Sequence, residues 1–197
     1  MAEPKFIIPH LLLFSLLIST VHSTTSSSSS PSDFIRSSCR ITRYPDLCLQ
    51  SLASYGPAVQ SNPRELARFA LAVSADRARA ASSFVGQLCD KSNKARTRTG
   101  GPVRDCLENM ADSVDRLKEA ADELARMGRT SSTGFKFHMS NVQTWCSAAL
   151  TDQNTCLDGL GKNVEPETRS AIRKKVVEVA QVTSNALALV NRVSGSK

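Results

Sequence analysis

Four stretches of the chain repeat apolar side chains at the spacing of one helix face, and the second and fourth alternate by four and three residues. This spacing is typical of helices that pack side by side. The predicted core positions are Leu66, Phe69, Val73, Ala80, Phe84 and Leu88 in the first stretch, Val103, Leu107, Met110, Val114, Leu117, Ala121 and Leu124 in the second, Val142, Trp145, Ala149, Cys156 and Leu160 in the third, and Ile172, Val176, Val179, Thr183, Ala186, Val190 and Val193 in the fourth.

Residues that start and stop helices bound these stretches. Asn62 can cap the first helix, with Pro63 at its first position and Glu65 able to reach back to the cap. We expect that helix to run to about Asp90, and the second to begin near Pro102. The remaining predicted boundaries are Gly128 and Gly161, which end the second and third helices, and Pro166, which starts the fourth.

Four long helices with short connections predict an all-α fold. Over residues 62–193 we expect an up-down-up-down four-helix bundle, stapled by disulfides, whose neighbouring helices cross at about 20°. Strand signals are weak throughout the chain. The basic segment 91–104, which contains two glycines, is then a connection between the first two helices.

A shorter unit precedes the bundle at residues 33–54. Pro45 breaks the chain between Cys39 and Cys48, because proline suits the first turn of a helix and disfavours helix before it. We therefore predict an N-terminal helical hairpin, clipped by a Cys39–Cys48 disulfide, that packs at one end of the bundle or projects from it.

Residues 1–23 have the pattern of a secretory signal peptide. Lys5 precedes an apolar run, and Ser23 provides the cleavage site. A membrane anchor is the weaker alternative, because Pro9 interrupts a run already shorter than the ~20 residues that a span needs. Residues 24–32 are rich in serine and threonine and are expected to form a flexible tail. We expect the mature chain in the extracellular space.

The six cysteines are expected to be partly oxidised in a secreted protein. In an antiparallel bundle Cys106, near the start of the second helix, lies level with Cys156, near the end of the third, which favours a Cys106–Cys156 disulfide. Cys89 lies at this level too. Cys146 is about 15 Å from Cys156 along its helix, and therefore about as far from the level of Cys89. A Cys89–Cys146 disulfide is disfavoured, because the two Cα atoms of a disulfide lie within about 7 Å of each other. We predict that Cys89 and Cys146 remain thiols, with Cys146 a small buried apolar side chain.

The formal net charge of +7 favours acidic surroundings or partners. Outside the cell, an acidic polysaccharide or an anionic protein surface is a more suitable partner than nucleic acid. Plain solubility is the alternative explanation of the charge.

Side chains that could catalyse a reaction or hold a metal are scarce. His138 is the only histidine after the leader, and zinc needs three or four ligands, so we predict no metal site and no cofactor. We expect His138 to be exposed and structural, and Trp145 to pack in the core. Glu108, Asp112 and Asp115 recur along one side of the second helix, which predicts either a solvated face or a binding surface.

Several segments together resemble a known family. They are the Cys39–Cys48 hairpin with Thr42-Arg-Tyr-Pro45, the run Asn62-Pro-Arg-Glu-Leu-Ala67, the run Cys106-Leu-Glu-Asn-Met-Ala-Asp112, the run Asn141-Val-Gln-Thr-Trp-Cys-Ser-Ala-Ala-Leu-Thr-Asp152 through Thr155-Cys156-Leu-Asp158-Gly159, and Asn185-Ala-Leu-Ala-Leu189. With them, residues 33–193 resemble the plant invertase and pectin methylesterase inhibitor family. The resemblance implies a four-helix bundle with an N-terminal helical hairpin and the same two disulfides. Cys89 and Cys146 depart from the family's usual four cysteines.

The resemblance also implies a function without catalysis. One branch of the family inhibits pectin methylesterase in the plant cell wall, and the other inhibits acid invertase through a Pro-Lys-Phe segment between the second and third helices. This chain has Phe135-Lys136-Phe137 there, without the proline, and its 141–151 run is more similar to the methylesterase branch.

The resemblance therefore implies a secreted inhibitor that covers the pectin-binding cleft of a plant pectin methylesterase in a 1:1 complex. The partner-binding residues carried over by position are Glu108, Asp112 and Asp115 on the second helix, and Gln143, Thr155 and Asp158 on the third. The alternatives are an inhibitor of cell-wall or vacuolar acid invertase, and a non-inhibitory wall protein that binds acidic pectin through segment 91–104.

Overall fold

The structure, a computed structural model, describes residues 30–94, 100–129 and 132–195. The leader predicted at residues 1–23 and most of the predicted tail lie outside the described residues. The elements are α1 (Pro31–Cys39), α2 (Pro45–Leu52), the 3₁₀ turn η1 (Ala53–Tyr55), α3 (Gly56–Val59), α4 (Pro63–Lys94), α5 (Gly100–Arg126), α6 (Phe135–Gly159) and α7 (Pro166–Gly195). No strand occurs in these ranges, which confirms the all-α prediction.

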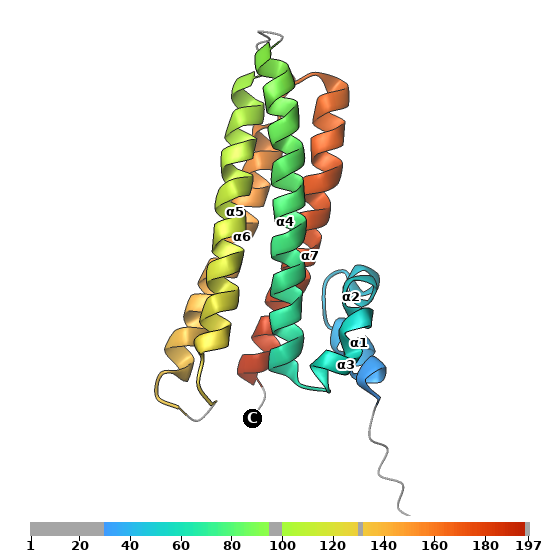
Figure 1. Cartoon of the computed structure of the whole chain (residues 1–197), viewed down its shortest axis with the longest axis vertical. Helices are drawn as coiled ribbons and strands as arrows, with labels where there is room; N and C mark the ends of the chain where they lie inside the picture. The colour runs from blue at the N-terminus through green and yellow to red at the C-terminus, as the bar shows by residue number, and fades with distance from the viewer. Residues whose placement is uncertain (1–29, 95–99, 130–131, 196–197) are drawn as a thin grey trace, which may run out of the picture.

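The four long helices α4 to α7 form an antiparallel bundle (Figure 1). Each helix packs on the next in sequence, and α7 closes the ring by packing on α4. The up-down-up-down prediction is therefore confirmed. Both of the first two bundle helices are longer than predicted at their shared end, because α4 continues to Lys94 and α5 begins at Gly100.

The core positions predicted for α7 are confirmed, since all seven side chains from Ile172 to Val193 are buried. In α5 only every second predicted position is correct. Four of the seven predicted core residues are buried, namely Val103, Met110, Leu117 and Leu124. At the other three positions, the buried residue comes one place earlier in the sequence than predicted. The buried alternate residues are Cys106, Ser113 and Ala120, whereas Leu107, Val114 and Ala121 are half-buried.

The core face predicted for α4 is largely wrong. Its inner face consists mainly of small residues that let neighbouring helices approach closely. The buried members are Leu66, Ala67, Ala70, Leu71, Ser74, Ala75, Ala78, Ala81, Val85 and Cys89. Of the predicted positions, Leu66 is buried and Ala80 is exposed, and the others are half-buried at the edge of the core.

The start of α4 is capped as predicted, but Glu65 has another partner. The Asn62 Oδ1 atom accepts a hydrogen bond from the backbone N–H of Arg64 at 2.9 Å. The Glu65 carboxylate instead accepts from the Arg68 guanidinium at 2.8 Å, so it does not close a capping box. The Arg64 guanidinium donates to the Leu124 carbonyl at 2.7 Å and so ties the start of α4 to the end of α5.

The N-terminal hairpin lies along one side of the bundle, beside the lower halves of α4 and α7 (Figure 1). A Cys39–Cys48 disulfide joins α1 to α2. Asn185, buried on α7, holds the turn between them: its Oδ1 accepts from the Tyr44 N–H at 3.0 Å, and its Nδ2 donates to the Tyr44 carbonyl at 2.9 Å. The hairpin thus packs on the side of the bundle rather than on an end. Helix α1 begins at Pro31, two residues before the predicted start, and α3 was not predicted.

Cys89 and Cys146 are buried, and neither is in a disulfide. Burial raises the pKa of the Cys146 thiol to about 12. A thiol that does not ionise near neutral pH is unreactive, because the thiolate is the nucleophile. Cys146 therefore acts as a small apolar side chain in the core.

Candidate functional site

A second disulfide fixes α5 against α6. It joins Cys106 to Cys156, with the Cα atoms 4.1 Å apart. The bond sets the axial register of the two helices, so that residues near Cys106 lie beside residues near Cys156. In the chain-entropy model a loop of this length contributes about 4 kcal/mol to stability.

Five of the six predicted partner-binding residues are exposed on the outer surface of α5 and α6 near this disulfide. Glu108, Asp112 and Asp115 lie on α5, and Thr155 and Asp158 lie on α6. We call these five residues the α5–α6 face. Glu108, Thr155 and Asp158 are each within two residues of a bonded cysteine. Asp115 is about 10 Å farther along α5 than Glu108.

Gln143 lies apart from the other five residues. It is half-buried, and its Nε2 donates to the Asn191 Oδ1 of α7 at 2.9 Å. It therefore lies at the α6–α7 junction, about 18 Å along α6 from Thr155. The structure gives Gln143 an intramolecular partner and does not bring it to the α5–α6 face.

Beside this face, Arg116 connects the two helices through two contacts that the sequence did not reveal. Its Nε donates to the Asp152 carboxylate at 2.9 Å, and its guanidinium carbon is 5.8 Å from the centre of the Trp145 ring. Burial raises the pKa of Asp152, the Arg116 charge opposes that rise, and the nearby Asp112 charge adds to it. Trp145 is half-buried at the core edge rather than inside the core as predicted. Arg116 and Asp152 are far apart in sequence, so no local pattern pairs them.

Farther down the same two helices, a polar cluster is centred on the buried Glu123. Its carboxylate accepts from Asn141 Nδ2 at 2.8 Å and from Arg126 Nη2 at 3.0 Å, and it lies 2.8 Å from His138 Nδ1. Hydrogen bonds from Asn141 first, and then from His138 and Arg126, lower the pKa of Glu123 to about 2. The prediction that His138 is exposed is wrong, because it is half-buried against Glu123.

The interior of the bundle also holds a polar layer. The fully buried Gln153 of α6 donates from Nε2 to Ser113 of α5 at 2.8 Å and to Thr183 of α7 at 3.1 Å. Its Oε1 atom has no hydrogen-bond partner. Buried polar contacts of this kind favour one register of the helices, because a shift would leave more groups unsatisfied.

The Phe135-Lys136-Phe137 segment forms the first turn of α6 rather than a loop between helices. Phe135 is buried and anchors the turn in the core. Lys136 and Phe137 are exposed, and Phe137 is 66% exposed.

Across the ranges that the structure describes, no three potential metal-ligating side chains are grouped together. Among those same residues, no helix is sufficiently long and apolar to cross a membrane. The α5–α6 face presents carboxylates and a hydroxyl to solvent. Such a surface suits binding to basic or polar groups of a partner.

Comparisons with known proteins identify the chain's relatives. A family model described as "Plant invertase/pectin methylesterase inhibitor" matches residues 33–189. The "21 kDa protein" of Daucus carota is 44% identical over 181 residues, which cover 91% of this chain and 92% of the relative. "Pectinesterase inhibitor 9" of Arabidopsis thaliana is 44% identical over 185 residues, which cover 92% of this chain and 91% of the relative. A crystal structure of a mutant form of a pectin methylesterase inhibitor from Arabidopsis has the same fold, with a TM-score of 0.60 at 22% identity over 78% of this chain and 92% of that one.

Proposed function

The chain belongs to the plant invertase/pectin methylesterase inhibitor family, and we propose that it is a secreted inhibitor of a plant pectin methylesterase. The relatives named pectinesterase inhibitors are inhibitor proteins and not enzymes. The observation that carries the proposal is the 44% identity over nearly the whole chain to a protein named as a pectinesterase inhibitor. The predicted leader at residues 1–23 and the two disulfides support secretion into the cell wall space.

In this proposal the α5–α6 face docks on the enzyme as a 1:1 complex and covers the cleft that takes up pectin. Glu108, Asp112, Asp115 and Asp158 contact basic or polar groups around the cleft, and Thr155 accepts a hydrogen bond there. The Thr155 hydroxyl already donates to the Thr151 carbonyl at 2.8 Å, which leaves its oxygen lone pairs for a partner's donor. Inhibition then requires only exclusion of substrate and no chemical reaction.

The scaffold supports this role because it holds the docking side chains on fixed backbone. The Cys106–Cys156 disulfide, the Arg116–Asp152 ion pair and the Gln153 contacts all join α5 to its neighbours. A surface that is rigid before binding loses little conformational entropy on association. Affinity can therefore come from few polar contacts, which salt will weaken.

The test is titration of the purified mature protein against a plant pectin methylesterase and, separately, against an acid invertase. We expect stoichiometric loss of esterase activity, with one inhibitor and one enzyme molecule in the complex by light scattering. Loss of invertase activity with unchanged esterase activity would contradict the proposal.

Acid invertase is the second candidate target, and one observation favours it. The exposed Phe137 and its neighbour Lys136 lie where the invertase branch carries its Pro-Lys-Phe segment. If invertase is the target, the double substitution Lys136→Ala/Phe137→Ala abolishes invertase inhibition, while substitutions on the α5–α6 face do not.

A further inference from the structure

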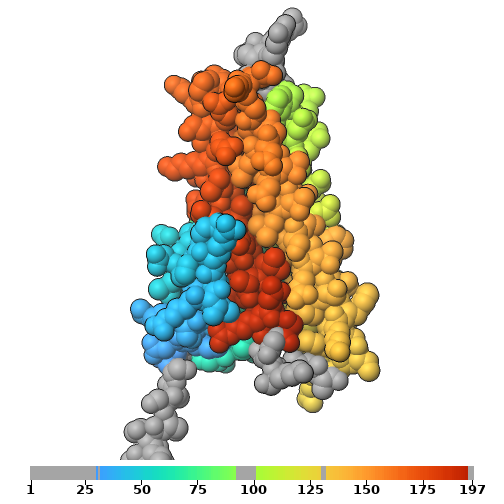
Figure 2. Space-filling view, turned by 180° about the vertical axis from the view of Figure 1, so that it is seen from behind, coloured from blue at the N-terminus to red at the C-terminus, as the bar shows by residue number. Residues whose placement is uncertain are grey.

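The hairpin covers only half of the side of the bundle formed by α4 and α7. Figure 2 shows the hairpin in blue beside the lower, red part of α7, while the first half of α7, in orange, is bare. Arg77 of α4 marks the edge of the covered part, where its guanidinium donates to Ser51 of α2 at 3.3 Å and pairs with Glu178 of α7. The upper half of this side has no covering element among the described residues.

Two shallow depressions flank α7 on this bare surface. One, of about 290 Å³, lies between α4 and α7, with Phe84 and Ala80 on one wall and Lys175 on the other. The second, of about 520 Å³, is lined by residues of α7 alone: Pro166, Arg169, Ser170, Arg173, Lys174 and Val177. Each depression therefore combines apolar side chains with cations.

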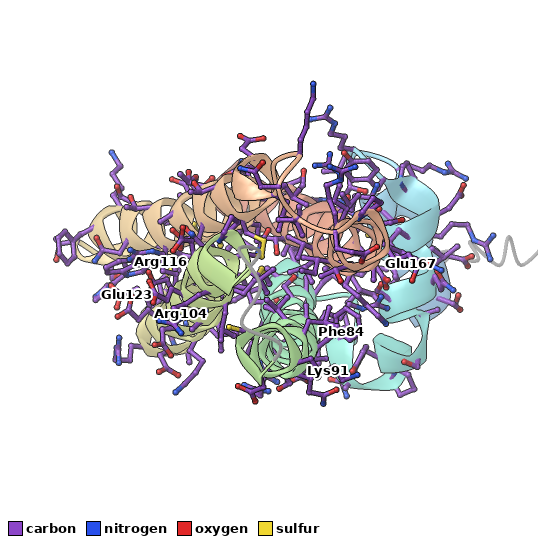
Figure 3. All side chains as sticks on the ribbon, turned by 90° about the horizontal axis from the view of Figure 1, so that it is seen from above. Phe84, Lys91, Arg104, Arg116, Glu123 and Glu167 are labelled. Atoms are coloured by element: carbon purple, nitrogen blue, oxygen red, sulfur yellow. A yellow bond between two sulfur atoms is a disulfide. The ribbon has the colours of Figure 1, made fainter. Side chains whose placement is uncertain are left out.

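The cations of this surface are available for a ligand. Lys174 and Lys175 are exposed and make no ion pair with any residue in the described ranges. Lys91 follows Phe84 by seven residues and so lies on the same stripe of α4, as the labelled side chains in Figure 3 show. Of the carboxylates nearby, Glu178 is paired with Arg77, and Glu167 is exposed. We call Lys91, Arg169, Arg173, Lys174 and Lys175, with Phe84 and Val177, the basic surface.

Arg169 and Arg173 are held in place by backbone carbonyls of the α6–α7 connection and of α6. Their guanidinium groups donate to the Gly161 carbonyl at 3.3 Å and to the Leu157 carbonyl at 3.1 Å. From Arg169 to Lys175 the cations extend about 9 Å along α7. Charges spread over such a length match an extended polyanion better than one small anion.

We propose that the basic surface binds an acidic polysaccharide, namely pectin whose methyl esters have been removed. Hydrolysis of a methyl ester leaves a carboxylate, and Lys and Arg bind carboxylates through charge-assisted hydrogen bonds. The apolar C–H faces of the sugar rings pack on Phe84 and Val177. The choice of pectin as the polymer rests on the proposed function, whereas the basic surface itself does not.

The composition of the surface disfavours two other partners. Val177 is its only large apolar side chain that is substantially exposed, at 37%, which is too little to insert into a lipid bilayer or to bury an amphipathic helix.

The basic surface is also on another side of the bundle from the α5–α6 face. In Figure 3, Phe84 and Lys91 lie away from Arg116. The inhibitor can therefore hold the polymer and the enzyme at the same time.

The experiment measures binding of the purified mature protein to polygalacturonate, to fully methyl-esterified pectin and to phosphatidylserine vesicles, at low and at high salt. Of the three ligands, we expect the protein to bind only polygalacturonate, and to bind it more weakly at high salt. The substitution Lys174→Glu/Lys175→Glu should reduce that binding about tenfold. The matched control Lys118→Glu/Lys136→Glu, which changes the net charge equally on exposed sites of α5 and α6, should reduce it much less.

Several results would overturn the proposal. They are no binding of the unaltered protein to polygalacturonate, equal loss in the control variant, or vesicle binding as strong as polymer binding. Loss with Arg96→Glu/Arg98→Glu, but not with Lys174→Glu/Lys175→Glu, would assign the polymer to the α4–α5 connection instead. Complex formation with the esterase, measured without pectin, should be unchanged by Lys174→Glu/Lys175→Glu, so failure of the proposed function is detected separately.

Discussion

The two sides of the bundle are stabilised in different ways. On the α5–α6 side the helices are joined by the Cys106–Cys156 disulfide and by cross-helix polar contacts, and no other helix of the described ranges covers them. On the α4–α7 side small apolar residues pack closely, and the hairpin covers the lower half. An uncovered pair of helices cannot rely on an overlying element to hold its geometry. The covalent bond and the polar contacts therefore lie where the proposed docking requires a rigid, exposed surface.

The largest expected effect comes from removing the two disulfides separately. Replacing Cys106 and Cys156 by alanine should lower the free energy of unfolding by about 4 kcal/mol, against about 2.6 kcal/mol for Cys39 and Cys48, because the first bond closes the longer loop. Urea unfolding of both variants measures the difference. A larger loss of unfolding free energy from removing Cys39–Cys48 would contradict this order, because it would show that the hairpin depends more on its disulfide than the α5–α6 side does.

The next effect concerns how the hairpin is attached to the bundle. Asn185→Ala removes both hydrogen bonds to Tyr44 and should cost about 1–3 kcal/mol, because it leaves the part-buried N–H of Tyr44 without its partner, whereas the Tyr44 carbonyl still accepts from the Cys48 N–H. The exchange rate of backbone amide hydrogens should rise in α1 and α2 and stay unchanged in α5 and α6. Increased exchange throughout the chain would mean that the hairpin and the bundle unfold together.

The acid dependence of stability should differ between two carboxyl groups of the α5–α6 side. Glu123 has a pKa of about 2 when folded, below its ordinary value of 4.5, so its contribution is present above pH 4.5 and is lost as the pH falls toward 2. Glu123→Gln should flatten the stability profile in this range. Asp152 has a pKa above its ordinary value of 3.8 when folded, so it opposes the rise of stability with pH just above 3.8. Asp152→Asn removes this opposition and should steepen the stability profile there. Chemical unfolding at a series of pH values measures both slopes, and equal slopes in the two variants would contradict the assignment.

The smallest effect is expected where the hairpin unit joins α4. Gln60 and Ser61 have positive φ angles of 47° and 61°, which are unfavourable for residues with a Cβ atom. Gln60→Gly relieves one of these angles, although glycine also makes the unfolded chain more flexible. We expect a net gain of up to about 1 kcal/mol in thermal or chemical unfolding. A loss of stability would show that the Gln60 side chain contributes more than its backbone costs.

The same two sides differ in how well the sequence predicted them. On α7 the seven predicted core positions are readable because nearly all are aliphatic and follow one alternation of four and three. On α4 the largest side chains misled the prediction, because Phe69 and Val73 face the hairpin: Phe69 stacks on Tyr55, with ring centres 4.7 Å apart. Half of the buried residues on the inner face of α4 are alanines, which carry little hydrophobic signal.

For the candidate site, the sequence and the family resemblance located the exposed carboxylates and both disulfides. They did not reveal Arg116 with Asp152 or Glu123 with His138, since each pair joins residues on different helices. Only the register of α5 against α6 brings these groups together. Gln143 was included by position, and its contact with Asn191 could be seen only once α7 was placed.

The measurement that tests the account most directly is the affinity of the protein for a pectin methylesterase after charge reversal on the α5–α6 face. Asp112→Lys/Asp115→Lys should raise the Kd about a hundredfold, because it places like charges against the basic groups of the partner. Asp90→Lys/Glu167→Lys, which makes the same charge change on exposed sites of α4 and α7, should leave the Kd within about threefold. Equal Kd values for the two variants, in calorimetry without pectin present, would contradict docking through this face.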